Sequence, residues 1–240
     1  MKSMKETRSA LLALVVAPLL ALGAGPVQAQ IDAGACGQIG GDGGYGPFDY
    51  RKERGNPLHL VESAHFTPSV EALVRGNAGT IGADLDYTLR AFPNHHRALV
   101  SAMRYFDRNK GVQPPGMRYS MECYFERALK YKPDDVTARM LYAGYLGKHG
   151  RRDDALREAG YVAHEAADNP FTHYNLGLVY LELKDYEHAV EQAHQAMALG
   201  FPRTELRDSL QAAGKWTEPP AGSASGVAGA ASAVAGDANR

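Results

Sequence analysis

Two histidines, His95 and His96, stand side by side in the segment FPNHHRAL, where they are candidates for metal binding or proton transfer. Successive residues of a helix point about 100° apart, so the two imidazoles need ligands from elsewhere to hold one ion. We therefore favour a structural role: Asn94 caps a helix and both histidines lie in its first turn, one packed between helices and the other at solvent. The alternative is a metal-binding or enzymatic accessory protein that uses four histidines: His59, His65, His95 and His96.

Common catalytic motifs are absent from the sequence. In HEAAD, residues 164–168, Asp168 stands where a zinc protease has its second histidine. The sequence has no G-x-S-x-G turn and no pattern typical of a cysteine nucleophile. Residues 41–46, GDGGYG, match G-x-G-x-x-G, but no helix is predicted after them, so nucleotide binding is not expected. A catalytic site made of two paired carboxylates leaves no sequence signature, so that alternative stays open. Apart from it, we predict no enzyme activity and no cofactor.

The two cysteines, Cys36 and Cys123, predict a disulfide, because a lone pair of cysteines in an oxidising compartment is usually bonded. Cys123 lies about 200° round its predicted helix from Met121, on the outer face and away from the apolar stripe. A bond to Cys36 would tie a glycine-rich segment to that face and stabilise the fold by about 4–5 kcal/mol through chain entropy. The alternative is two unpaired thiols.

The first residues have the pattern of a signal peptide. A basic start precedes the apolar run 10–22 and the small-residue site Val27-Gln28-Ala29, which predicts cleavage after Ala29 and a signal peptide over 1–29. The alternative is a retained membrane anchor, but the apolar run is shorter than the roughly 20 residues that span a bilayer. We therefore expect a periplasmic or secreted protein without stable membrane insertion after cleavage.

The charge balance argues against nucleic acid as a partner. The chain has 26 basic and 27 acidic side chains, a net charge of −1. No long basic run follows the first residues, so the electrostatic footprint of a nucleic-acid-binding surface is missing.

Between a glycine-rich segment and a low-complexity tail, the apolar spacing is helical almost throughout. Residues 30–66 predict an irregular arm, and residues 217–240, rich in Ala, Gly and Ser, predict a disordered tail. Thr67-Pro68 is typical of a helix start, and Gly76 is suited to end that helix. The predicted fold class is all-α.

Residues 137–170 and 171–204 are similar to one another when they are aligned without a gap. Small residues fall at the same offsets, as expected where two antiparallel helices approach closely. The matched pairs are Ala143 with Gly177, Ala155 with Ala189, and Ala159 with Ala193.

This pattern resembles the tetratricopeptide repeat (TPR), a helix–turn–helix unit of about 34 residues. The resemblance rests on Leu176-Gly177, Tyr180, Asp185-Tyr186, Ala189 and Ala196. The resemblance is strong over 136–203 and weaker over 67–135, and it implies a TPR-like α-solenoid over 67–216 with a C-terminal capping helix at 203–216. The blocks GPFDYR, HFTPSVEAL and ECYFERAL are also similar to a subgroup of exported proteobacterial repeat proteins, described by their repeats rather than by an activity.

The resemblance implies that the first helices of the repeats line a concave face that binds peptides or helices. The groove residues that it implies are Met140, Gly144, Lys148, Tyr174, Asn175, Leu178, Leu181 and Glu182. Asn175 coincides with an asparagine that some TPR domains use to hold a peptide's C-terminal carboxylate. Because Met140 and Gly144 stand where lysine and asparagine would be needed, we do not expect that clamp. We expect a protein–protein interaction module or scaffold that binds an apolar or amphipathic segment of an envelope protein.

Overall fold

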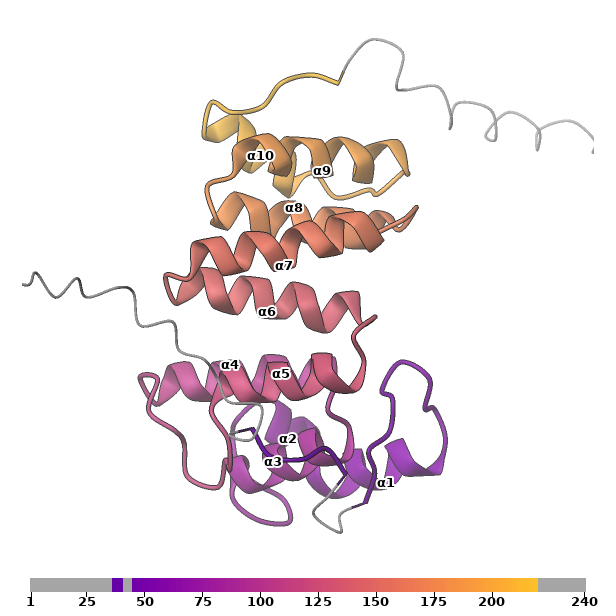
Figure 1. Ribbon diagram of the computed structural model, residues 1–240, viewed down its shortest axis with the longest axis vertical. Coiled ribbons are helices and arrows are strands. Elements are labelled where there is room, and N and C mark those ends of the chain that lie inside the picture. The colour runs from indigo at the N-terminus through magenta and orange to yellow at the C-terminus, as the bar shows by residue number, and fades with distance from the viewer. Residues whose placement is uncertain (1–35, 41–44, 220–240) are drawn as a thin grey trace, which may run out of the picture. The chain divides into compact units, whose positions relative to one another are not determined.

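The structure is a computed structural model, and it describes residues 36–40 and 45–219. The predicted signal peptide and most of the predicted tail lie outside these residues. Within them the chain forms ten helices and no strand, which confirms the all-α prediction (Figure 1). None of these helices is both long and apolar enough to cross a bilayer.

The helices follow one another with short connections, except for longer loops between α2 and α3 and between α4 and α5. The first five are α1 Asn56–His65, α2 Pro68–Glu71, α3 Ile81–Ala91, α4 His96–Arg108 and α5 Met121–Tyr131. The last five are α6 Val136–Lys148, α7 Arg152–Glu165, α8 Pro170–Glu182, α9 Tyr186–Ala198 and α10 Glu205–Ala212.

Helix α1 corrects the prediction of an irregular arm over residues 30–66. The glycine-rich stretch stops at Gly55, and a proline follows in the first turn of the helix, where it is well tolerated. Leu58 and Val61 share one side of α1 and pack on the cluster formed with Phe92, Ala91 and the aromatic residues of the preceding segment. Residues 45–55 remain without regular structure; we refer to them as the arm.

Helix α2 begins as predicted, with Thr67 as N-cap and Pro68 in the first turn, but it stops at Glu71. The chain leaves the helix because Leu73 takes a left-handed conformation, with φ at 56°. Gly76 therefore does not end the helix. It is needed for a close approach, since a Cβ at this position would lie 1.9 Å from the carbonyl oxygen of Gly79.

Side-chain caps fix where the later helices begin. The first residues of α3, α4, α5, α6, α8 and α9 are all preceded by a side chain that accepts a hydrogen bond from a backbone N–H of the first turn. These caps are Thr80, His95, Ser120, Asp135, Asn169 and Asp185.

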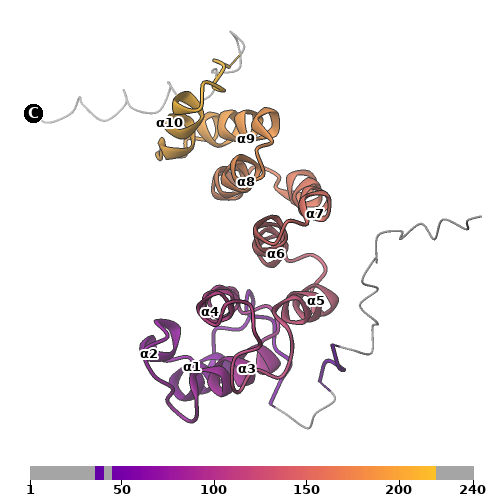
Figure 2. The same ribbon diagram turned by 90° about the vertical axis from the view of Figure 1, so that its left-hand side faces the viewer.

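Helix α6 packs along α7, and α8 packs along α9. The starts of the two pairs are shifted by the same interval, Val136 to Pro170 and Arg152 to Tyr186, as the sequence similarity predicts. The contact surfaces contain small, fully buried residues such as Ala143 and Ala155. Helix α4 contacts α6, and α6 contacts α8, so these three helices form one column beside α5, α7 and α9 (Figure 2).

Candidate functional site

A groove lies between α4, α6 and α8, with a volume of about 220 Å³. Six of the predicted groove residues line it: Met140, Gly144, Lys148, Asn175, Leu178 and Glu182. The other lining residues are Met103, Leu141, Tyr145 and Val179. A smaller hollow of about 80 Å³ shares Gly144, Lys148, Val179 and Glu182 with it and extends it towards Leu183.

Two predicted groove residues, Tyr174 and Leu181, do not line this groove. Tyr174 is buried; its hydroxyl donates to Glu205 Oε2 at 3.1 Å, and its ring lies 4.7 Å from that of Phe201. Burial and the neighbouring carboxylate raise the pKa of Tyr174. Leu181 packs against the buried cluster that includes Leu206 of α10. Both residues lie on the neighbouring side of α8, about 100° from the row that faces the groove.

The residues that sequence reasoning missed follow a simple pattern on α6 and α8. Leu141 and Tyr145 alternate with Gly144 and Lys148 at spacings of three and four, and Val179 follows Leu178. The three missed residues on α6 and α8 could therefore have been found from their helical spacing relative to the predicted residues that do line the groove. Met103 lies on α4, where the internal similarity of the sequence is weaker, and only the contact between α4 and α6 brings it to the groove.

The apolar lining residues form what we call the floor of the groove: Met103, Met140, Leu141, Gly144, Leu178 and Val179. The polar lining residues are Tyr145, Lys148, Asn175 and Glu182. Asn175 donates one of the two N–H groups of its side-chain amide to the carbonyl oxygen of Phe171 at 2.8 Å. Lys148 and Glu182 are exposed at one end of the groove, and neither forms an ion pair with a described residue. Burial and the carboxylates of Glu122 and Asp107 raise the pKa of Tyr145, which keeps its hydroxyl protonated.

Gly144 in the groove floor differs from the two other glycines of α6 and α8. A Cβ at Gly147 would lie 2.6 Å from Leu183 Cδ2, and one at Gly177 would lie 2.4 Å from Leu206 Cδ2, so internal packing explains both glycines. A Cβ at Gly144 would have no atom within 4 Å. The space above Gly144 is therefore open to the groove.

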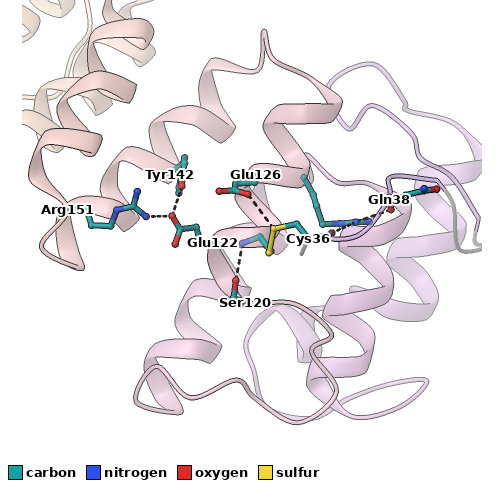
Figure 3. Close-up of a disulfide and its surroundings, with 9 residues drawn as sticks. Cys36, Gln38, Ser120, Glu122, Glu126, Tyr142 and Arg151 are labelled. Atoms are coloured by element: carbon teal, nitrogen blue, oxygen red, sulfur yellow. Dashed lines mark hydrogen bonds and ion pairs between the residues drawn. A yellow bond between two sulfur atoms is a disulfide. The ribbon is translucent and has the colours of Figure 1, made fainter. Parts of the chain in front are cut away.

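The disulfide between Cys36 and Cys123 is present, with 5.1 Å between the two Cα atoms (Figure 3). Both cysteines are buried, which corrects the expectation that Cys123 lies on an outer face. Residues 36–40, which we call the N-terminal segment, lie against this side of α5: Arg127 donates to the carbonyl oxygens of Cys36 at 2.8 Å and Gln38 at 3.0 Å. Glu126 Oε2 lies 3.3 Å from Cys36 Sγ, and burial together with Glu122 raises the pKa of Glu126.

The arm meets the helices through a buried polar network centred on Asn94, which we call the junction network. The side-chain NH2 group of Asn94 donates to Asp49 Oδ1 and to Asp135 Oδ2, both at 2.8 Å. The side-chain oxygen of Asn94 accepts from the backbone N–H of Tyr50 at 3.0 Å. His96 Nε2 lies 2.9 Å from Asp135. Burial alone raises the pKa of Asp135, but hydrogen bonds from His96, the backbone of Ala138 and Asn94 outweigh it and lower the pKa.

His95 is fully buried and is itself the N-cap of α4, which corrects the assignment of this role to Asn94. Its Nδ1 accepts from the backbone N–H of Ala98 at 3.1 Å, its Nε2 lies 3.1 Å from Glu62 Oε1, and its ring stacks on Tyr50 at 4.0 Å. Asn94 cannot serve as the cap because its side chain is used in the junction network. Burial lowers the pKa of His95 despite the neighbouring Glu62. A neutral ring that accepts at Nδ1 and donates from Nε2 satisfies both contacts.

The alternative metal site is not assembled in the described part of the chain. His95 and His96 face different carboxylates, His65 Nδ1 lies 2.9 Å from Asp84 Oδ1, and His59 is exposed on α1. Residues 36–40 and 45–219 contain no group of three or more His, Cys, Asp and Glu side chains arranged to hold an ion. The pair of histidines joins the arm to the helices instead.

The chain was compared with models of protein families, with curated proteins and with solved structures. None of the three comparisons found a match, so the groove and its surroundings are the basis for any functional conclusion.

Proposed function

We propose that the protein is an exported protein–protein interaction module that binds an apolar segment of an envelope protein in the groove between α4, α6 and α8. The observation that carries the proposal is the groove itself, which is apolar at its floor and open to solvent. Its apolar side chains are half-buried or, for Met140, buried, and a concave apolar lining with a few polar groups is typical of a binding site. Six of its residues are those that the TPR resemblance assigns to a ligand-binding face.

A TPR-like α-solenoid is the architecture that we propose for residues 67–216. It is supported by the two helix pairs, which start at corresponding positions of the two similar segments, and by the small residues between their helices. Helix α10 would act as the capping helix. It buries Leu206 and Leu210 against α8 and α9 and leaves polar residues such as Arg207 and Asp208 towards solvent.

We place this module in the periplasm or outside the cell. The disulfide supports an oxidising compartment, because cytosolic disulfides are rare. The signal-peptide pattern of residues 1–29 agrees with this location.

The proposal is tested by affinity capture from an envelope extract of the native host with two matched variants. Gly144→Trp fills the groove floor, whereas Gly160→Trp places the same side chain on the exposed surface of α7; no atom lies within 4 Å of a Cβ at either position. We expect Gly160→Trp to retain the partner and Gly144→Trp to lose it, with unchanged circular dichroism for both. Capture of the same partner by Gly144→Trp would contradict the proposal. Tyr174 is unsuitable for such a test because it supports Glu205 of α10.

A further inference from the structure

The shape of the groove bears on what kind of segment it accepts. Lining residues run along α6 from Met140 to Lys148, which is about 12 Å at 1.5 Å per residue, and along α8 from Asn175 to Glu182. Lys148 and Glu182 also line the smaller hollow together, so the two helices run in the same direction. The groove is therefore a slot about two helical turns long between two parallel helices. At about 220 Å³ it lies below the usual size of a small-molecule site.

The apolar part of the lining offers no side-chain hydrogen-bonding groups to a bound backbone, and the polar side chains of the groove are those of Tyr145, Lys148, Asn175 and Glu182. The floor residues Met103, Met140, Leu141, Leu178 and Val179 have none in their side chains that bonds well, and the backbone groups of the helices are used within the helices. The side-chain amide of Asn175 already uses one of its two N–H groups on the carbonyl oxygen of Phe171. An extended peptide would bury unpaired N–H and C=O groups here, whereas a helix arrives with its backbone hydrogen bonds made.

Gly144 provides a socket at the middle of the slot. Open space at a helical glycine is not by itself a sign of binding, since a Cβ at Gly160 on α7 would also have no atom within 4 Å. Gly144 differs because apolar residues of three helices surround it and because it lies between the two ends of the lining on α6. A large apolar side chain of a partner would reach the backbone of α6 at this point, as a knob enters a hole between packed helices.

Lys148 and Glu182 add a charge signature at one end. They carry opposite charges, line the same end of the groove and remain without an ion pair among the described residues. A partner that carries one acidic and one basic residue at the corresponding end would be complementary to both.

We infer that the segment bound in this groove is an amphipathic helix. It seats one bulky apolar side chain over Gly144 and presents an acidic and a basic residue to Lys148 and Glu182. The inference rests on the proposed function and specifies its partner.

A peptide display selection tests this inference. Random peptides of about 16 residues, long enough for four helical turns, are depleted on immobilised Gly144→Trp protein and then selected on the wild-type protein. Enriched peptides are synthesised, and their affinity is measured for the wild-type protein and for the Gly144→Trp and Gly160→Trp variants. Thermal unfolding of all three proteins establishes beforehand that the variants are folded.

The expected peptides carry large apolar residues at positions i, i+3 or i+4, and i+7, and they gain helical circular dichroism when they bind. Their affinity falls at least about ten-fold on Gly144→Trp and stays unchanged on Gly160→Trp. Peptides that need the groove but contain proline in the apolar stretch, or alternate apolar and polar residues, would overturn the inference and leave the proposed function standing. Peptides that bind Gly144→Trp as tightly as wild type, or a selection without enrichment, would overturn both.

The charge signature has its own control. The double variant Lys148→Glu with Glu182→Lys should weaken a selected peptide about two- to five-fold, the range of exposed ion pairs. A peptide with its acidic and basic residues exchanged should recover that loss. Equal affinity of both peptides for both proteins would contradict the assignment of the two charged residues.

Discussion

The region from α6 to α10 and the region from the arm to α5 are stabilised by different interactions. Between α6 and α10, fully buried alanines such as Ala143, Ala155 and Ala159 allow neighbouring helices to approach closely. Between the arm and α5, the buried residues include Asp49, Asn94 and other polar groups that bond to each other across long stretches of the chain. Small apolar residues repeat along a sequence, whereas a polar network has no period.

The caps of α4, α6 and α8 show the same difference on a smaller scale. The residues at this position are His95, Asp135 and Asn169, and each accepts from the first turn of its helix. Among the described residues, the side chain of Asn169 accepts only from the backbone N–H groups of Phe171 and Thr172, which are nearby in the chain. His95 and Asp135 also bond to side chains that lie 33 and 39 positions away in the chain, so their loss affects more than one helix.

The largest effect is expected from removing the disulfide, which joins two residues 87 positions apart. In the chain-entropy treatment, closing a loop of this length contributes about 4–5 kcal/mol to the free energy of unfolding. The double variant Cys36→Ala with Cys123→Ala should lose about that amount in urea denaturation. A loss below about 1 kcal/mol would mean that hydrogen bonds such as those of Arg127 hold the N-terminal segment without the covalent bond.

Two N-cap variants compare how much a cap contributes to the stability of the polar region and of the apolar region. Asp135→Ala leaves Asn94, His96 and the Ala138 N–H without their buried acceptor, and we expect a loss of about 3–5 kcal/mol. Asn169→Ala removes only a local cap and should cost about 1 kcal/mol. Chemical denaturation measures both, and equal losses would show that the junction network adds nothing beyond a cap.

Two adjacent residues of α7 test close packing in the apolar region. Ala159 is fully buried, so Ala159→Leu should overfill the helix contact and destabilise the protein by about 1–3 kcal/mol. Gly160 is exposed with open space around it, so Gly160→Ala should stabilise the helix by about 0.5–1 kcal/mol. Thermal unfolding of both variants shows whether each substitution stabilises or destabilises the protein. A neutral Ala159→Leu would show that the helices can move apart there.

A dependence of stability on pH is expected from His95. Its pKa is lowered in the folded protein, so the folded state binds fewer protons than the unfolded state below about pH 6.5, and stability falls as the pH decreases from there. The slope can reach about 1.4 kcal/mol per pH unit for one such group. His95→Asn keeps a capping side chain and should remove this slope between about pH 6.5 and 5. Denaturation at several pH values measures it, and an unchanged slope would assign the effect to other groups.

The sequence predicts this fold best where one helix pair repeats the other. The internal similarity locates the starts of α6 to α9, and prolines at 93 and 133 mark the breaks before α4 and α6. Helix α1 was missed because the glycine content of residues 30–55 masks the short apolar pattern of Leu58 and Val61. The cap at His95 was misplaced by one residue because nothing local shows that the side chain of Asn94 is used elsewhere.

Only those features of the groove that follow from helical spacing could be predicted from the sequence. Positions spaced by three and four on α6 and α8 identify one side of each helix, which is why Gly144 and Leu178 were found. The choice between neighbouring sides of α8 depends on α10, whose Glu205 holds Tyr174 away from the groove. The junction network was not predicted at all, because residues 49, 94 and 135 come together only in three dimensions.

The position of Asn94 between Asp49 and Asp135 also has a consequence for the order of folding. The helix pairs α6–α7 and α8–α9 join neighbouring parts of the chain and can form as soon as each pair is complete. The arm depends on contacts 45 and 83 positions further along the chain, from Asp49 to Asn94 and from Arg51 to Asp134. Although the arm precedes every helix of the described residues, we therefore expect it to reach its final place only after the turn before α6 has formed.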